Sequence, residues 1–102
     1  MASSARVIQL HPDDNVVTAL EDLAPGTAFV SGGRTLATKE PVPFGYKVAV
    51  AFIPAGGQVL KYGLPIGVAT EPIEAGAVVH THNLKSLAEL AYLGTEQGGR
   101  QS

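Results

Sequence analysis

The segment Ile53-Pro-Ala-Gly56-Gly-Gln-Val59 contains the pattern that decides the fold: an apolar residue, a glycine three positions later, and a second apolar residue three positions after that. The same pattern occurs in Leu23-Ala-Pro-Gly26-Thr-Ala-Phe29 and in Ile73-Glu-Ala-Gly76-Ala-Val-Val79. Each copy is typical of a tight turn in which the glycine takes positive φ and the flanking apolar side chains reach the core. The copies are spaced too irregularly for a solenoid. Three tight turns of this kind instead predict a compact, strongly bent all-β body.

The size and composition of the chain exclude several classes of protein. Its 102 residues are enough for one domain, and 12 glycines with seven prolines are too many chain breakers for a helical bundle. A net charge of -2 with scattered cations argues against nucleic-acid binding, and no apolar stretch approaches the ~20 residues of a membrane-spanning helix. No secretory signal is visible, and the absence of cysteine excludes thiolate chemistry and fits a cytoplasmic location.

Short apolar runs between glycine and proline turns predict strands over most of the chain. The pair Gly32-Gly33 is in addition a hairpin signal. We therefore expect a mainly β fold, with short strands within residues 5–10, 27–30, 34–38, 46–52, 58–62, 66–70 and 77–82.

Two segments have helical spacing instead. A short helix is predicted near residues 14–23, with Asp13 or Asp14 as its N-cap, from the apolar positions Val16, Val17, Leu20 and Leu23. A C-terminal helix is predicted near residues 84–93, closed by Gly94, from the apolar positions Leu84, Leu87, Leu90 and Leu93. Whether that helix packs on its own domain or docks on a partner stays open. Residues 1–4 and 95–102 are expected to be flexible.

The most suggestive candidate site is His80-Thr81-His82. On a strand, positions i and i+2 point to the same face, so two imidazoles would project together toward a metal or an anionic substrate. The alternative is a strand end that carries two surface or half-buried histidines. No third protein ligand is evident, since His11 joins them only if the fold brings the ends together.

Two lysines are candidates for binding a carboxylate. Lys61, at the end of a predicted strand, and Lys47 each offer a point charge. The alternative for both is an ordinary solvated lysine on a strand.

Several of these residues belong to motifs that resemble a known family. The chain is similar to the amino-terminal SAF domain of the altronate/galactarate dehydratase family, which has a β-clip fold, over roughly residues 7–84. The motifs are Asp14-Asn15-Val16, Ile53-Pro54-Ala55-Gly56, Lys61-Tyr62-Gly63-x-x-Ile66-Gly67 and Ile73-x-x-Gly76-x-x-Val79-His80-x-His82-Asn83. One departure is Tyr46, in Gly45-Tyr46-Lys47, where the family commonly has histidine.

The resemblance implies a domain organisation and a function. It implies a β-clip domain at residues 5–83, a docking or packing helix at 84–94, and a separate small subunit of a metal-dependent carbon–oxygen or carbon–sulfur lyase. The expected substrate is a sugar acid or 2-hydroxy acid. A divalent metal such as Fe²⁺ is expected on a large catalytic subunit, so this chain alone would be inactive.

The resemblance also implies roles for single residues. His80 and His82 would serve in catalysis, with metal binding by this pair also possible. Substrate binding would fall to Lys47, Lys61, Tyr62 and Asn83. Three alternatives stay open: a non-enzymatic SAF module that binds a carbohydrate or protein, a stand-alone sugar-acid binder, and a homodimer.

Overall fold

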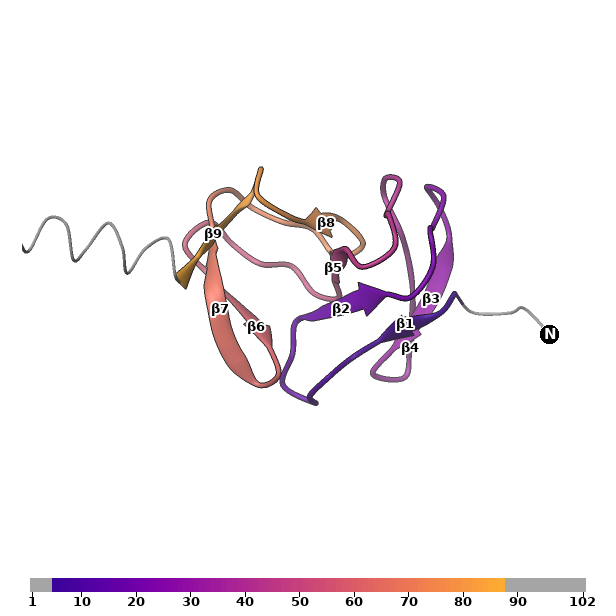
Figure 1. Cartoon of the computed structure of the whole chain (residues 1–102), viewed down its shortest axis with the longest axis horizontal. Helices are drawn as coiled ribbons and strands as arrows, with labels where there is room; N and C mark the ends of the chain where they lie inside the picture. Colours follow the sequence, from indigo (N-terminus) through magenta and orange to yellow (C-terminus); the bar gives the residue numbers. More distant parts are fainter. Residues whose placement is uncertain (1–4, 88–102) are drawn as a thin grey trace, which may run out of the picture.

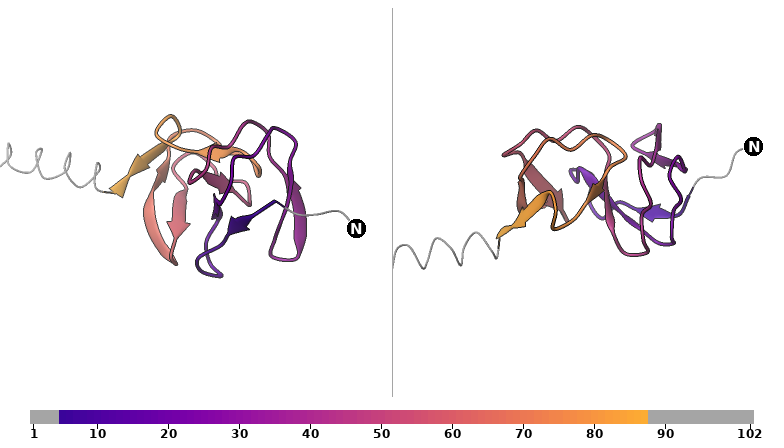
Figure 2. Two further views of the ribbon diagram at one scale, coloured as in Figure 1. Left: turned by 45° about the vertical axis from the view of Figure 1, so that its right-hand side comes forward. Right: turned by 90° about the horizontal axis from the view of Figure 1, so that it is seen from above.

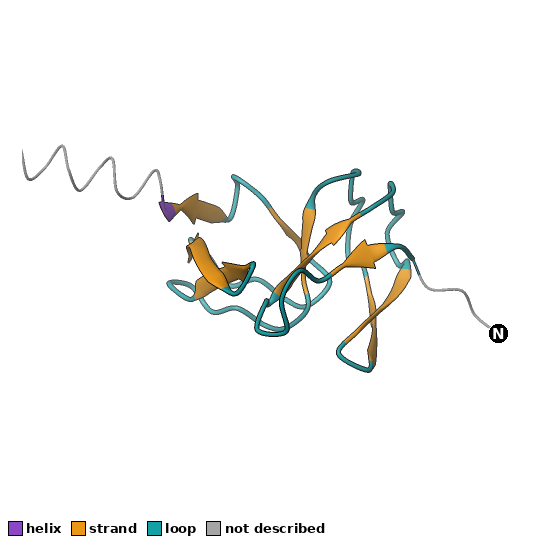
Figure 3. Cartoon of the chain, turned by 60° about the horizontal axis from the view of Figure 1, so that its bottom comes forward, coloured by secondary structure: helices purple, strands orange, loops and turns teal. Residues whose placement is uncertain are grey.

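Short strands joined by turns make up the part of the chain that the structure describes. The computed structural model describes residues 5–87, and loops join its strands with almost no helix (Figure 1, Figure 3). The mainly β class predicted from the sequence is confirmed. The strands are β1 Val7–Ile8, β2 Val16–Ala19, β3 Ala28–Ser31, β4 Arg34–Ala37, β5 Lys47–Ala49, β6 Gln58–Lys61, β7 Leu64–Ala69, β8 Val78–Val79 and β9 Leu84–Ser86.

These strands form three antiparallel sheets. The central sheet has the order β1-β2-β5-β8, and the other two are the β3–β4 hairpin and the sheet β6-β7-β9. Views from two directions place the central sheet between the β3–β4 hairpin at one end and the β6-β7-β9 sheet at the other (Figures 1 and 2). The bent, multi-sheet body agrees with the turn pattern in the sequence.

A fourth turn resembles the three predicted from the sequence, namely Val42-Pro-Phe-Gly45-Tyr-Lys-Val48. The glycines of these four turns, Gly26, Gly45, Gly56 and Gly76, have φ values between 78° and 92°. Isolated β-bridges join Leu23 to Val42 and Ile53 to Ile73. The four turns therefore form two bridged pairs, and the fold consists of two similar repeats.

Each repeat contains one hairpin, β3–β4 in the first and β6–β7 in the second. The connecting turns are Gly32-Gly33 and Tyr62-Gly63, and both residues of each turn have positive φ. Equivalent residues are 30 positions apart up to these turns and 31 apart after β7. An irregularity in the β6–β7 register between Val59 and Leu60 accounts for the extra residue, because a bulge adds one residue to one strand.

Two buried clusters form the core, one for each repeat. The first contains Val17, Ala19, Leu23, Phe29, Val42, Val48, Val50 and Val78. The second contains Val16, Ala49, Ile53, Val59, Ala69, Ile73 and Val79. Neighbouring residues of β2 and of β5 thus enter different clusters, because successive side chains of a strand point to opposite faces.

The helix predicted near residues 14–23 is wrong. Val16 to Ala19 form β2, which pairs with β1 and β5. Both faces of this strand are buried, so its apolar run has no period of two and imitates a helical pattern.

The predicted C-terminal helix is wrong at its start. Residues Leu84–Ser86 form β9, which pairs with β7 in the register Gly67 to Ser86 and Ala69 to Leu84. The remainder of that prediction, residues 88–93, lies outside the described residues, as do the expected flexible ends. Within residues 5–87 there is no helix long and apolar enough to cross a membrane.

Candidate functional site

The first part of the candidate site lies where β5 and β8 pair. Lys47 lies opposite Val79 in this ladder, which brings the preceding Tyr46 alongside the following His80. The two rings stack with centroids 4.4 Å apart and an angle of 24° between their planes. Tyr46, noted from the sequence only as a departure from the family, therefore fixes one face of the candidate catalytic imidazole.

The segment that carries the two histidines is a turn, so the predicted strand over residues 77–82 is wrong beyond Val79. The Asn83 side chain is 5% exposed and closes the turn: its Oδ1 accepts from the His80 N–H at 2.9 Å, and its Nδ2 donates to the Val78 carbonyl at 2.8 Å. This competing hydrogen bonding ends the strand. His80 is half-buried and His82 is exposed, and the argument that a strand aligns them does not hold.

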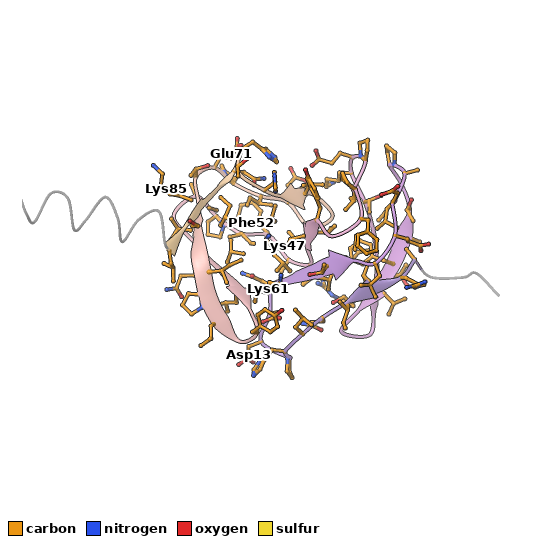
Figure 4. All side chains as sticks on the ribbon, in the orientation of Figure 1. Asp13, Lys47, Phe52, Lys61, Glu71 and Lys85 are labelled. Atoms are coloured by element: carbon orange, nitrogen blue, oxygen red, sulfur yellow. The ribbon has the colours of Figure 1, made fainter. Side chains whose placement is uncertain are left out.

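The second part of the site is a pair of lysines from two different sheets. Lys47 of β5 is half-buried, and Lys61 ends β6 (Figure 4). Burial and, to a smaller extent, the nearby Lys61 ammonium hold the pKa of Lys47 below its ordinary value. Among residues 5–87, ion pairs join His11 to Asp13 and Lys39 to Glu74, and no carboxylate lies within ion-pair distance of Lys47 or Lys61. Within residues 5–87, the site therefore holds two ammonium groups that have no salt-bridge partner.

Tyr62 follows Lys61 directly and lies beneath it. The Lys61 Nζ is 5.4 Å from the centre of the exposed Tyr62 ring, a cation–π distance. Tyr62 has a φ of 61°, the only positive φ of a non-glycine residue in the described part of the chain. Strained backbone of this kind is often found at functional sites.

The turn that follows Lys61 is held by Asp14, one of the two aspartates, with Asp13, that the sequence predicted as a helix N-cap. The carboxylate is 4% exposed, and its two oxygens accept from the Tyr62 N–H at 3.0 Å and the Gly63 N–H at 2.7 Å. Asn15 adds two bonds to β6, donating to the Gln58 carbonyl at 2.9 Å and accepting from the Leu60 N–H at 2.8 Å. Since these contacts span more than 40 residues, local sequence patterns could not reveal them.

The donors for a metal ion are incomplete in this part of the chain. Residues 5–87 hold no group of three or more His, Asp or Glu side chains placed to bind a metal. His11 lies against the β6–β7 turn, where its ring would meet a Cβ added at Gly63 at 2.8 Å. His80 and His82 alone do not fit the complete ligand set that a divalent metal requires.

Comparisons with known proteins agree with this arrangement of motifs. Residues 5–87 match the family model described as the altronate/galactarate dehydratase SAF domain. The chain is 44% identical over 79 residues to an altronate dehydratase of Escherichia coli (strain K12), and 40% identical over 76 residues to a galactarate dehydratase (L-threo-forming) of the same organism. It is also 43% identical over 51 residues to a (2R)-sulfolactate sulfo-lyase subunit alpha of Paracoccus pantotrophus.

The extent of these matches differs between the relatives. The matched regions are 78%, 72% and 50% of this chain, in the same order. They make up 16% and 14% of the two dehydratases, but 76% of the sulfo-lyase subunit. The chain therefore corresponds to a small part of the long relatives and to most of a short one.

Proposed function

Because the chain belongs to the altronate/galactarate dehydratase SAF domain family, we propose that it is the small subunit of a lyase acting on a sugar acid or another 2-hydroxy acid. In such a reaction a proton leaves the carbon next to a carboxylate, and water or sulfite departs from the neighbouring carbon. The resemblance inferred from the motifs is confirmed. We also propose that the enzyme is cytoplasmic and that this chain acts in it together with a larger partner subunit.

The observation that carries the proposal is the uncompensated pair Lys47 and Lys61. A half-buried ammonium beside a second ammonium is unfavourable in the free protein, as the lowered pKa of Lys47 reflects. An anion placed between them relieves this repulsion. Hydrogen bonds between ammonium and carboxylate are also stronger than neutral ones. We assign to this pair the binding of the substrate carboxylate.

The remaining residues fit around that anion site. His80, fixed by Tyr46 and the 80–83 turn, is assigned to hydrogen bonding with a substrate hydroxyl or to proton transfer. The exposed His82 is assigned a similar role, and the Tyr62 hydroxyl a contact with the substrate. Asn83 supports His80, because backbone groups engage both polar atoms of its amide.

The proposal places the metal and the main catalytic base on a separate large subunit. The described residues of this chain do not supply a metal-ligand set, and the chain matches a small fraction of the long dehydratases. The match to most of a protein named as subunit alpha supports a multi-subunit enzyme. A metal of this kind stabilises the negative charge that develops beside the carboxylate.

The test is to purify this chain from extracts of its own cells and to assay what accompanies it. We expect a stoichiometric partner of several hundred residues, and a complex that turns over altronate, galactarate or sulfolactate while the chain alone does not. Turnover by the single chain with added divalent metal would contradict the division of labour. A chain that purifies only as a homodimer without lyase activity would support the alternative of a binding module.

A further inference from the structure

Asp14 is a buried charge that the proposed reaction does not use. It is nearly inaccessible to solvent, yet each of its oxygens accepts a backbone N–H from the Tyr62-Gly63 turn. Two charge-assisted bonds to consecutive amides fix the position and direction of a turn more firmly than one neutral bond does. An asparagine cannot do the same, because its NH₂ group would face one of the two donors.

The equivalent hairpin of the first repeat shows that the fold does not require this arrangement. Its turn residues Gly32 and Gly33 have φ values of 59° and 78°, close to the 61° and 73° of Tyr62 and Gly63. Glycine adopts this conformation without strain, whereas tyrosine does not. The second repeat thus holds a strained tyrosine in place, and Asp14 accepts the N–H of that same residue.

The position of this turn decides where Lys61 lies. Lys61 directly precedes Tyr62 and lies over its ring, so the direction of its side chain depends on the turn. Lys47 belongs to the central sheet and Lys61 to the sheet β6-β7-β9, and no ladder of backbone hydrogen bonds joins these two sheets in the described part of the chain. Hydrogen bonds from Asp14 and Asn15, which lie just before β2, join that sheet to β6 and its turn.

We infer that Asp14 is a positioning residue: its carboxylate holds the Tyr62-Gly63 turn so that Lys61 lies beside Lys47 and completes an anion-binding pair. The inference rests on the proposed function for the identity of the anion, a substrate carboxylate. The bonds from Asp14 to the turn, and the position of Lys61 over the Tyr62 ring, do not depend on that identity. The test therefore has one readout for geometry and one for binding.

The experiment compares Asp14→Asn with Asp13→Asn in the full chain. Asp13 is a matched control, because it is the neighbouring carboxylate, it is exposed, and its partner is His11 at 3.9 Å. NMR titration of the Lys47 side chain measures its pKa, and titration with galactarate measures anion affinity. We expect the Lys47 pKa in Asp14→Asn to rise toward the ordinary lysine value, because Lys61 moves away.

The direction of this shift distinguishes positioning from a plain charge effect. Removing a carboxylate without moving any lysine lowers the pKa of nearby lysines, so an unchanged or lower Lys47 pKa in Asp14→Asn overturns the inference. Galactarate affinity should fall about tenfold or more in Asp14→Asn and stay unchanged in Asp13→Asn. If the Lys47 pKa rises as expected but the parent chain binds no galactarate, the positioning role stands and the proposed anion is wrong.

A second pair of variants keeps the test decisive if Asp14→Asn does not fold. Tyr62→Gly relieves the strain of the turn, so the double variant Asp14→Asn with Tyr62→Gly tolerates the lost carboxylate better. Its Lys47 pKa should be higher than that of Tyr62→Gly alone. Equal values in the two would overturn the inference.

Discussion

The two repeats share a backbone but differ in the residues placed on it. Gly32-Gly33 in the first repeat and Tyr62-Gly63 in the second form two-residue turns with nearly the same φ values. The first turn uses the residue that this conformation favours, and the second uses a tyrosine that it disfavours. The backbone conformation therefore accounts for the glycine in the first turn, but it does not account for the tyrosine in the second.

The charges differ between the repeats in the same way. Lys61 stands where the first repeat has Ser31, and Lys47, in the Gly45 turn of the first repeat, stands where the second repeat has Val78, so neither lysine has a charged equivalent. The comparison teaches that the repeated glycines and apolar residues maintain the fold. The residues that depart from the repeat, namely Lys47, Lys61 and Tyr62, mark the candidate site.

The largest expected difference between the repeats concerns their second glycine turns. A Cβ at Gly76 would lie 2.1 Å from the Ala37 carbonyl oxygen, whereas a Cβ at the equivalent Gly45 meets nothing within 4 Å. Gly76→Ala should destabilise the chain by about 4 kcal/mol or more, or prevent folding, and Gly45→Ala by about 1 kcal/mol from the positive φ alone. Chemical denaturation measures both, and equal losses would show that the close approach of the repeats at Gly76 is wrong.

A smaller difference is expected between the second residues of the two hairpin turns. Gly33→Ala introduces only the strain of positive φ, because its Cβ meets nothing within 4 Å. Gly63→Ala also forces the His11 ring to move. We expect Gly63→Ala to cost roughly 0.5 to 1.5 kcal/mol more than Gly33→Ala, since moving that ring loses the hydrogen bond that its Nδ1 accepts from the Asp13 N–H. Thermal melting of the two variants checks this, and a Gly33→Ala variant that is the less stable would contradict it.

The pH dependence of stability should follow Lys47. Burial and Lys61 lower its pKa in the folded chain, so between that value and the ordinary lysine pKa the unfolded chain binds more protons. Stability without ligand should therefore rise with pH across this window, while affinity for a carboxylate falls as Lys47 loses its proton. Lys47→Met should abolish both trends, as measured by melting and by ligand titration. Persistence of both trends in this variant would assign them to another group.

The smallest expected effects come from substitutions at the first position of each hairpin turn, Gly32 in the first repeat and Tyr62 in the second. Tyr62→Gly should raise stability by about 0.5 to 1 kcal/mol through relief of strain, and Gly32→Ala should lower it by a similar amount. The two changes in denaturation midpoint should have opposite signs. A loss of stability in Tyr62→Gly would mean that ring contacts outweigh the strain.

Part of this structure could be read from the sequence because the signals are local. The glycine turns at Gly26, Gly56 and Gly76 predicted a bent β fold, and the copy at Gly45 has the same spacing but closely follows Pro41 and Pro43 in a segment that resembles a loop. The helix predicted at 14–23 failed because β2 is buried on both faces, and burial on both faces is a tertiary property.

The candidate site depends on contacts that no local pattern contains. The motifs indicated His80, Lys47 and Lys61, but the Tyr46–His80 stack follows from the β5–β8 register. The bonds from Asp14 to Tyr62 and Gly63 join segments almost 50 residues apart. A buried aspartate and a helix-capping aspartate look the same in one sequence, so only the fold could separate them.

The central claim, that Lys47 helps to bind the substrate carboxylate for a lyase, is tested most directly by kcat/KM. The complex of this chain with the large subunit proposed for it is compared with the same complex carrying Lys47→Met or, as a control, Lys85→Met, which changes a lysine of β9 far from Lys47 (Figure 4). We predict a fall in kcat/KM of about tenfold to a hundredfold for Lys47→Met and almost none for Lys85→Met, because a hydrogen bond to a charged group contributes roughly 1.5–3 kcal/mol. Equal kcat/KM in the two variants would contradict the account.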